Sequence, residues 1–265
     1  MYMQYLIPVL LFAALGVLAG VLLTVCSKVF AVKVDERLEQ LQEALPQINC
    51  GSCGYSGCNA YAEAILNGGA PLNMCKPGGT QSAAKLGEIM GVETDHPEQE
   101  VAFVRCSGNC NVTKHKYVYD GSQSCRASNR YYNGSKICTS GCLGYGDCVE
   151  ACPNGAISIV DRIAKVDVNK CIGCGLCAKA CPNELIVIRR KSQKVDVGCK
   201  STAIGKITHS VCENGCIGCK MCEKKCPNGA ITVANNFANI DYSKCDNCGE
   251  CAKACRLGVI KVMGK

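Results

Sequence analysis

The residues of this chain that can do chemistry are its cysteines. There are 26 of them among 265 residues, and most stand two or three residues apart. Cysteines this close in sequence are poor disulfide partners but good ligands for one metal centre. Zinc sites usually separate two ligand pairs by a dozen or more residues and often include histidine, of which the chain has only three. The spacing therefore favours iron–sulfur clusters, with zinc as the alternative and a disulfide scaffold well behind both.

From Cys125 onward the cysteines repeat. Nine of them recur at one constant offset, the one that separates Cys125 from Cys199, which indicates a duplicated module. The first copy consists of Cys125, Cys138, Cys142, Cys148, Cys152, Cys171, Cys174, Cys177 and Cys181, and the second of Cys199, Cys212, Cys216, Cys222, Cys226, Cys245, Cys248, Cys251 and Cys255. The copies contain the C-x2-C-x2-C-x3-C runs of bacterial ferredoxins, in which the fourth cysteine of each run binds the other cluster of the pair.

This sharing of ligands between runs predicts three complete [4Fe–4S] clusters. Their ligand sets are Cys171, Cys174, Cys177 and Cys152; Cys216, Cys219, Cys222 and Cys255; and Cys245, Cys248, Cys251 and Cys226. A fourth run is defective, because Tyr145 stands at the position that corresponds to Cys219 in the second copy, where a cysteine is expected. With Cys138 as the nearest substitute, the sequence assigns this cluster to Cys138, Cys142, Cys148 and Cys181, and a three-iron centre is the alternative.

A separate cysteine group precedes the duplication. Its members are Cys50, Cys53 and Cys58, with glycines between them, and Cys75, which comes after a helical stretch at 59–66. This group predicts a fifth [4Fe–4S] cluster, again with zinc as the alternative. The cysteines that remain are Cys106, Cys110, Cys125, Cys199 and Cys212. One interpretation is a sixth cluster at Cys106, Cys110 and Cys125 with Cys199 or Cys212, and the other is buried thiols left by the duplication.

The elements that must position these cysteines are short, apart from the first. Residues 1–27 carry no charge, and the apolar stretch 5–26 matches the roughly 20 residues that cross a bilayer as a helix. Lys28, Lys33 and Arg37 follow it. This pattern predicts a single-pass anchor in the cytoplasmic membrane, with the cluster domains on the cytoplasmic side. A signal peptide, the alternative, would need a basic N-terminal region.

The expected fold class is α+β: one N-terminal transmembrane helix, a small helical [4Fe–4S] domain, and two tandem bacterial-type two-cluster ferredoxin modules. Short strands in small hairpins are expected at 156–160, 185–188, 230–233 and 259–262. The expected boundaries are an anchor at 1–27, a linker helix at 28–48, a single-cluster domain at 49–100, a cysteine-containing connector at 101–137, module 1 at 138–190, a connector at 191–211 and module 2 at 212–265.

The formal charge of +7 is weak evidence for nucleic-acid binding. It counts every cysteine as neutral, whereas each oxidised cluster with its thiolates contributes about −2, so that five clusters bring the total to about −3. The sequence also has no glycine-rich phosphate loop and no nucleophile–base pair. We therefore expect no nucleic-acid partner, no bound nucleotide and no catalytic residue in this chain.

The order of these parts resembles the B subunit of the Rnf complex, a membrane-bound ferredoxin:NAD oxidoreductase that pumps sodium ions or protons. The resemblance rests on the anchor, the segment 30–46, the signature 49–63 with Cys75, and the ferredoxin runs, and it covers nearly the whole chain. Two modules and the additional cysteines ahead of them make the chain similar to the longer, polyferredoxin-type members.

This resemblance implies the electron-transfer subunit of a translocase. Reduced soluble ferredoxin would deliver electrons to the cytoplasmic clusters, and the electrons would pass to membrane subunits or to the flavin- and NAD-binding subunit of the complex. Two other functions remain open on the residues alone. One is a redox-regulatory membrane protein that reduces a sensor, and the other is a protein that stores or delivers clusters.

Overall fold

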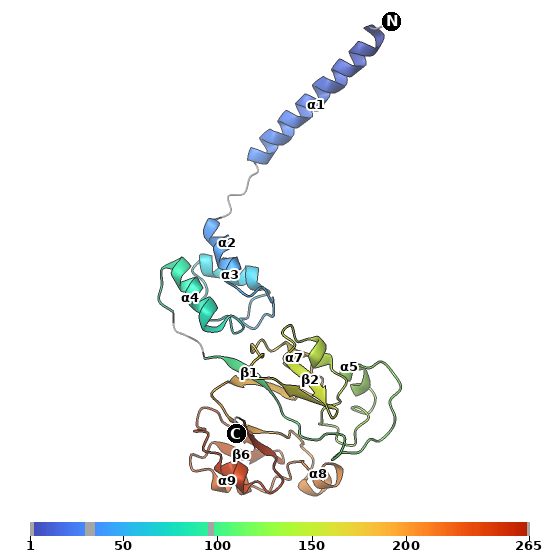
Figure 1. The fold of residues 1–265 in the computed structure, drawn as a ribbon, viewed down its shortest axis with the longest axis vertical. Helices are drawn as coiled ribbons and strands as arrows, with labels where there is room; N and C mark the ends of the chain where they lie inside the picture. The colour runs from blue at the N-terminus through green and yellow to red at the C-terminus, as the bar shows by residue number, and fades with distance from the viewer. Residues whose placement is uncertain (1–2, 30–34, 95–97, 264–265) are drawn as a thin grey trace. The chain divides into compact units, whose positions relative to one another are not determined.

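The computed structural model describes residues 3–29, 35–94 and 98–263, and the chain divides into two compact units, Met1–Gln40 and Leu41–Lys265 (Figure 1). The first unit contains helix α1 (Met3–Val29) and the beginning of α2 (Glu36–Glu43). In α1 the 20 residues Leu10–Val29 have a mean hydropathy of 2.4 and none of them is buried. A helix this long and apolar is able to cross a bilayer.

The second unit begins with a small helical part. It contains α3 (Cys58–Leu66), which begins and ends close to the expected helix, and α4 (Gly79–Met90). The backbone turns back after α3 at Gly68, whose φ of +69° is readily adopted only by glycine. A core of fully buried Leu41, Tyr61, Ile65 and Leu86 holds these helices together.

The strands of the described residues form four two-stranded antiparallel sheets. Two of them are hairpins at corresponding positions in the two copies of the repeat: β2 (Ile157–Val160) with β3 (Ile163–Val166), and β6 (Ile231–Ala234) with β7 (Phe237–Ile240). The other two join distant segments, β4 (Ile186–Arg190) with β1 (Glu100–Val104), and β8 (Ile260–Val262) with β5 (Val195–Val197). Residues expected in the two connectors therefore supply one strand to each module.

Six short helices carry or adjoin the cysteines of the modules. They are α5 (Cys125–Asn129), α6 (Asp147–Glu150), α7 (Leu176–Ala180), α8 (Gly205–Val211), α9 (Met221–Lys225) and α10 (Glu250–Ala254). Left-handed backbone precedes four of them, and three of those four positions are glycine: Gly146, Gly175 and Gly249. This turn brings the cysteine on each short helix back toward the preceding loop.

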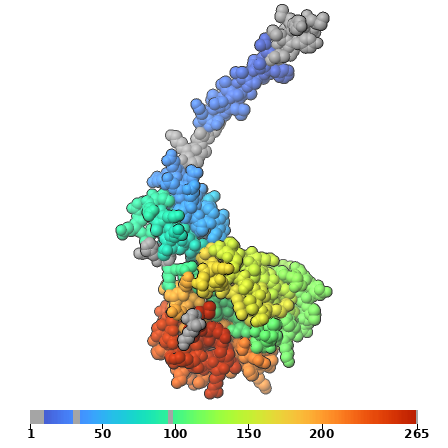
Figure 2. Space-filling view, in the orientation of Figure 1, coloured from blue at the N-terminus to red at the C-terminus, as the bar shows by residue number. Residues whose placement is uncertain are grey.

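Each module has a core of its own, and the two modules are in direct contact (Figure 2). Both cores are built from strand residues and the cysteines themselves. Between them, Arg189 Nε of β4 lies 2.7 Å from Asp196 Oδ2 of β5, with both side chains almost fully buried. Tyr242 donates a hydrogen bond of 2.6 Å to the other carboxylate oxygen of Asp196. The mixed helices and strands in two repeated modules confirm the expected fold class.

Candidate metal centres

The first cysteine group gathers around the beginning of α3. Asn49 Oδ1 accepts the backbone N–H of Cys58 at 2.8 Å, which closes the loop that carries Cys50 and Cys53. Burial raises the pKa of Cys75 to about 11, and the other three thiols of the group raise it further. The four thiols that the sequence assigns to one cluster are therefore neighbours in the structure.

Tyr61 and Gly78 hold Cys75 in place. The Tyr61 hydroxyl donates to the carbonyl of Pro71 at 2.6 Å and accepts the N–H of Met74 at 3.2 Å, so it fixes the loop just before Cys75. Burial raises the pKa of Tyr61 to about 12, which keeps the hydroxyl protonated as a donor. A Cβ added at Gly78 would lie 2.5 Å from Ser82 Cβ and 3.1 Å from Cys75 Sγ, so glycine leaves room for both side chains.

In module 1 the fourth cysteine of one run lies with three cysteines of the other. Burial raises the pKa of Cys177 to about 12, and the thiols of Cys174, Cys171 and Cys152 raise it further. Cys152 comes from the earlier run, so the grouping crosses between the runs. It matches the ligand sharing of two-cluster ferredoxins.

Module 2 repeats this arrangement at both of its sites. Burial raises the pKa of Cys251 to about 11, with further contributions from Cys245, Cys226 and Cys248. The other four thiols of the module line a cavity of about 290 Å³: Cys216, Cys219, Cys222 and Cys255. Both sets are the ones that the sequence assigned.

Backbone N–H groups point at the sulfur atoms of these sites. Ala156 donates to Cys152 Sγ at 3.3 Å, and Ala230, its counterpart in the second copy, donates to Cys226 Sγ at the same distance. Such hydrogen bonds stabilise thiolates and help to set the reduction potential of a cluster. The two copies therefore share the donors to sulfur together with the ligands.

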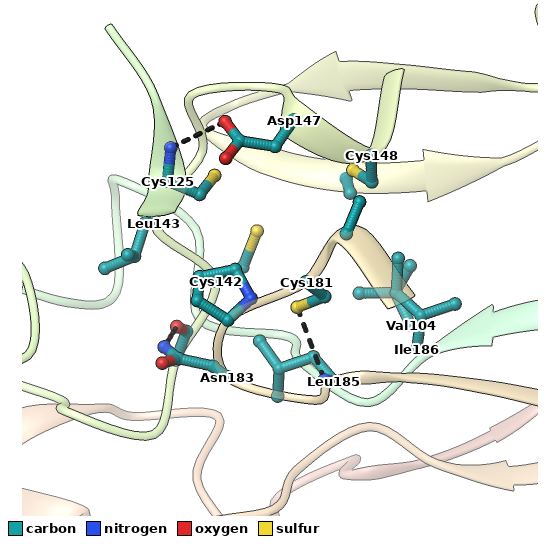
Figure 3. Close-up of a pocket in the computed structure, with 14 residues that line it drawn as sticks. Val104, Cys125, Cys142, Leu143, Asp147, Cys148, Cys181, Asn183, Leu185 and Ile186 are labelled. Atoms are coloured by element: carbon teal, nitrogen blue, oxygen red, sulfur yellow. Dashed lines mark hydrogen bonds between the residues drawn. The ribbon is translucent and has the colours of Figure 1, made fainter. Parts of the chain in front are cut away.

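The defective run forms a site with a different fourth thiol from the one expected. A small cavity of about 20 Å³ is lined by Cys125, Cys142, Cys148 and Cys181, and Figure 3 shows their sulfur atoms around a common space. Burial raises the pKa of Cys148 to about 12, with the thiols of Cys142, Cys125 and Cys181 among the further causes. Cys138, which the sequence placed in this group, does not line the cavity.

Asp147 is the reason that Cys125 takes this place. Its carboxylate accepts the backbone N–H of Cys125 at 2.6 Å (Figure 3), the N–H of Arg126 at 3.0 Å and the hydroxyl of Ser124 at 2.9 Å. Burial raises the pKa of Asp147, but these hydrogen bonds outweigh it and hold the pKa below its ordinary value. The first turn of α5 is thereby fixed beside Cys148, which follows Asp147 directly. No cysteine spacing could have predicted this contact.

Cys138 lies in a different cavity, at the junction of the two modules. This cavity, of about 20 Å³, is lined by the thiols of Cys106, Cys138, Cys199 and Cys212. The remaining unassigned cysteine, Cys110, is exposed and its thiol donates to Asn111 Oδ1 at 3.7 Å. The sixth group expected from the sequence is thus divided, because Cys125 joins the defective run and Cys110 faces solvent.

The first site and module 1 are held against each other by two side chains. Lys179 Nζ donates to the carbonyl of Cys50 at 3.0 Å, and the hydroxyl of Ser52 donates to the carbonyl of Cys174. Burial raises the pKa of Cys174, and the thiol of Cys50 contributes to the increase. The two cysteine groups are therefore neighbours.

The donor set of these cavities fits [4Fe–4S] clusters. Each group offers four thiols, and backbone N–H groups donate to the sulfur atoms of Cys152, Cys181 and Cys226; such clusters use these ligands and supporting hydrogen bonds. In the part of the chain that the structure describes, no three His, Cys, Asp or Glu side chains converge tightly enough to hold a single metal ion.

Family models agree with this assignment. Residues 45–77 match a family described as a putative Fe–S cluster, and residues 137–185 and 215–259 each match a 4Fe–4S dicluster domain. A second dicluster model covers 170–231 and so straddles the two modules. The first division agrees better with the structure, because each of its two matches falls on one of the separate cores. The chain therefore contains 4Fe–4S cluster domains.

Three relatives are similar over nearly the whole chain. The B subunit of the Na⁺-translocating ferredoxin:NAD⁺ oxidoreductase complex of Acetobacterium woodii is 41% identical over 96% of this chain and 77% of its own length. The B subunit of the ion-translocating oxidoreductase complex of Methanosarcina acetivorans is 43% identical, over 94% of this chain and 95% of its own length. The B subunit of the proton-translocating ferredoxin:NAD⁺ oxidoreductase complex of Clostridium ljungdahlii is 39% identical, over 94% and 89%.

Proposed function

Because the chain belongs to the family of B subunits of ion-translocating oxidoreductase complexes, the Rnf complexes, we propose that it accepts electrons from reduced ferredoxin and relays them to other subunits of such a complex. The observation that carries the proposal is the gathering of cysteines into groups of four across different runs. A protein with thiols for disulfides or for scattered metal ions has no need of such groups. Each bound cluster supplies reversible one-electron chemistry.

We assign five clusters to five groups of thiols. The ligand sets are Cys50, Cys53, Cys58 and Cys75; Cys152, Cys171, Cys174 and Cys177; Cys125, Cys142, Cys148 and Cys181; Cys216, Cys219, Cys222 and Cys255; and Cys226, Cys245, Cys248 and Cys251. These sets differ from the sets assigned from the sequence in one residue only, because Cys125 replaces Cys138. The protein around them fixes the thiols, buries them and directs N–H groups at their sulfur atoms.

The contacts between groups give the relay its order at the N-terminal end. The bonds of Lys179 and Ser52 join the first group to the Cys171 group, and Cys177 of that group is among the thiols that raise the pKa of Cys148 after burial. Electrons would therefore pass between the first group and the defective run by way of the Cys171 group. Because electron tunnelling falls steeply with distance, neighbouring groups are the favoured steps.

The anchor holds this relay at the membrane. Helix α1 is apolar and exposed along Leu10–Val29, and Lys28 lies at its C-terminal end. By the positive-inside rule, the modules that follow it are on the cytoplasmic side. This side is where a soluble ferredoxin and an NAD-binding partner would both be available. The chain would thus be bound to the lipid bilayer through α1, and it would also contact the membrane subunits of the complex.

Module 2 has the features of a docking site for an electron donor. Cys219 and Cys248 are exposed, whereas Cys174, which is likewise second in its run, is buried in module 1. Two exposed basic residues, Lys220 and Arg256, line the cavity of the Cys216 group. A basic rim around an exposed cluster attracts an acidic partner and speeds its association. We therefore place the entry of electrons from ferredoxin at module 2.

The test is electron transfer from reduced ferredoxin to the full chain, purified in detergent without oxygen. We expect the chain to oxidise several equivalents of ferredoxin, with the appearance of interacting low-potential EPR signals, and the rate to fall with ionic strength. A preparation that contains zinc without sulfide would refute the proposal. So would clusters that a chemical reductant reduces but reduced ferredoxin does not.

A further inference from the structure

An aromatic surface lies on the connector that carries Cys125. Four tyrosines, hereafter the tyrosine face, line one surface pocket of about 550 Å³: Tyr117, Tyr119, Tyr131 and Tyr132. Tyr131 is 58% exposed and Tyr132 81% exposed, and Val118, which also lines the pocket, is 94% exposed. Contiguous exposed side chains of this kind mark a surface that binds a partner, and tyrosine is enriched at such surfaces.

Contacts within the tyrosine face hold its rings in place. The rings of Tyr117 and Tyr132 meet edge to face with their centroids 6.5 Å apart, and those of Tyr119 and Tyr131 lie 6.0 Å apart. The Tyr117 hydroxyl donates to the carbonyl of Tyr131 at 2.7 Å. A Cβ added at Gly121 would lie 2.6 Å from the Tyr119 hydroxyl, so glycine leaves room for this ring. Aromatic side chains that are already fixed lose little conformational entropy when a partner covers them.

Tyr132 has an unfavourable backbone conformation and yet gains no burial from it. Its φ is +52°, in the left-handed region that bulky residues rarely adopt. The ammonium group of Lys116 donates to its carbonyl at 2.8 Å and helps to fix this conformation. Backbone strain of this kind is concentrated at functional sites, where the surrounding structure holds it. The strain here presents a large aromatic ring to solvent.

Tyr145 joins the tyrosine face to the cysteine group of the defective run. It stands where the second copy of the repeat has Cys219. Its ring lies edge to face with that of Tyr119 at a centroid distance of 5.7 Å, and the guanidinium of Arg162 lies 5.3 Å from its centre. Burial raises the pKa of the Cys125 thiol, and a hydrogen bond from the Tyr145 backbone partly offsets this rise. One residue thus contacts both the face and a thiol of the Cys125 group.

The charge around the tyrosine face is basic. The only acidic residue among positions 111–135 is Asp120. The same segment has four exposed basic side chains: Lys114, Lys116, Arg126 and Arg130. Among the ion pairs of the residues that the structure describes, none includes any of these four. A basic rim around an aromatic surface favours an acidic partner.

We propose that the tyrosine face is the docking site for an acidic surface of a second redox subunit of the complex, which takes electrons from the Cys125 group. The proposal rests on the proposed function and adds the place where electrons leave the chain. In each transfer one electron leaves an iron of the cluster, which is oxidised, and reduces a flavin or iron–sulfur centre of the partner. The pocket is concave, which suits a protein surface better than a flat bilayer.

Donor and acceptor have separate places on the chain. The pocket of the tyrosine face shares no lining residue with the cavity of the Cys216 group, where we place the entry of electrons from ferredoxin. Both partners can therefore be bound at the same time. The tyrosine face also adjoins the Cys125 group, whereas the ferredoxin site adjoins the Cys216 group. A change in one surface should leave the other working.

The first experiment identifies the partner in membranes that contain the assembled complex. The photo-crosslinking residue p-benzoylphenylalanine replaces Tyr132, whose side chain is exposed. We expect a crosslink to an acidic segment of another redox subunit, identified by mass spectrometry. The matched control position is Val92, which is 56% exposed and lies in the helical part that follows α4, outside the tyrosine face. It should give no crosslink to that segment.

The second experiment separates the exit of electrons from their entry. The variants are Tyr132→Ala, which removes an exposed ring, and Arg130→Glu, which reverses a charge at the rim. In the isolated full chain, kept in detergent without oxygen, both should retain the wild-type iron count and the wild-type rate of reduction by ferredoxin. In the assembled complex, the clusters are reduced by a single pulse of ferredoxin and their reoxidation is followed. Each variant should slow it at least about tenfold, as loss of a central interface residue does.

The control for the change of charge is Lys85→Glu. Lys85 is exposed on α4 and lies outside the tyrosine face, so this variant should keep the wild-type rate in both assays. The slower reoxidation of Arg130→Glu should also respond less to ionic strength than that of the wild type, because a steering charge has been reversed.

The outcomes separate this proposal from the proposed function. Wild-type reoxidation in both Tyr132→Ala and Arg130→Glu would overturn the docking site and leave the relay standing. Slower reduction of the isolated variants by ferredoxin would place ferredoxin itself on the tyrosine face and would overturn the proposal too, as would a crosslink from position 132 to lipid alone. Wild-type clusters that reduced ferredoxin does not reduce would instead overturn the proposed function.

Discussion

Removal of the Asp147 carboxylate should release the cluster of the defective run. The carboxylate accepts three hydrogen bonds, from the N–H groups of Cys125 and Arg126 and from the hydroxyl of Ser124. A hydrogen bond to a charged acceptor contributes about 1.5–3 kcal/mol. Asp147 is only partly buried, so water replaces part of what is lost, and we expect Asp147→Ala to destabilise the closed site by about 2–4 kcal/mol.

A loss of about 2 kcal/mol corresponds to about a 30-fold increase in the fraction of open sites. The assay follows iron release to a chelator under anaerobic conditions. Asp147→Ala should release about four irons in a new fast phase, while the other clusters keep the wild-type rate. Cys125→Ala should lack the same four irons from the outset, because it removes a ligand of that site.

Asp35→Ala is the matched control. Asp35 also accepts a backbone N–H, that of Arg37 at 3.0 Å, but it lies at the beginning of α2 and belongs to no cysteine site. It should release iron as the wild type does. If Asp147→Ala behaves like Asp35→Ala, or if Cys125→Ala retains all of its iron, the placement of Cys125 beside Cys148 is wrong.

Three further predictions concern the rest of the chain. Arg189→Met leaves Asp196 buried without its partner and should lower the free energy of unfolding by about 3–5 kcal/mol, measured by chemical denaturation. Lys253→Met, which removes an exposed ion pair, should not have this effect. Equal effects of the two variants would contradict the importance of the buried pair. Burial raises the pKa of Cys142 to about 11, and only the thiolate binds iron, so cluster insertion into the folded apo-chain should accelerate by up to about tenfold per pH unit from about pH 7 to 9. Cluster insertion is followed by absorbance, and an insertion rate that does not change with pH would contradict this prediction. Deletion of residues 1–29 should move the chain from the membrane to the soluble fraction with its iron count unchanged, and retention in the membrane would show a second means of attachment.

Much of the site could be predicted from cysteine spacing, because the cysteines of a ferredoxin run are close together in sequence. Within a run the ligands are a few residues apart, and a short loop followed by one turn of helix is enough to bring them together. The exchange of the fourth cysteine between runs is a fixed rule of the motif. Cys152 and Cys226 therefore lie in the groups that the sequence predicted for them.

The strands were predicted less completely, for a related reason. In the hairpins β2–β3 and β6–β7 the sequence predicted the first strand, but it did not name the second strand. The partners of β4 and β8 come from segments that the sequence placed in connectors, and nothing local indicates such a pairing. A prediction from periodicity finds a strand but does not find its partner.

The sequence by itself determined that the chain has an apolar anchor, one isolated cysteine group and a duplicated ferredoxin module, because each of these is defined by composition or by spacing over a short range. Only the tertiary structure places Cys125, rather than Cys138, beside Cys142, Cys148 and Cys181. Both cysteines have a counterpart at the constant offset of the repeat, so the offset does not distinguish them. The contacts of Asp147 with the backbone of Cys125 and Arg126 cannot be predicted from the repeat. The pairing of β1 with β4 and of β5 with β8 then brings Cys106 and Cys199 to the junction, where they meet Cys138 and Cys212. Contacts between residues far apart in sequence depend on the folded chain, and these contacts bring the four thiols together.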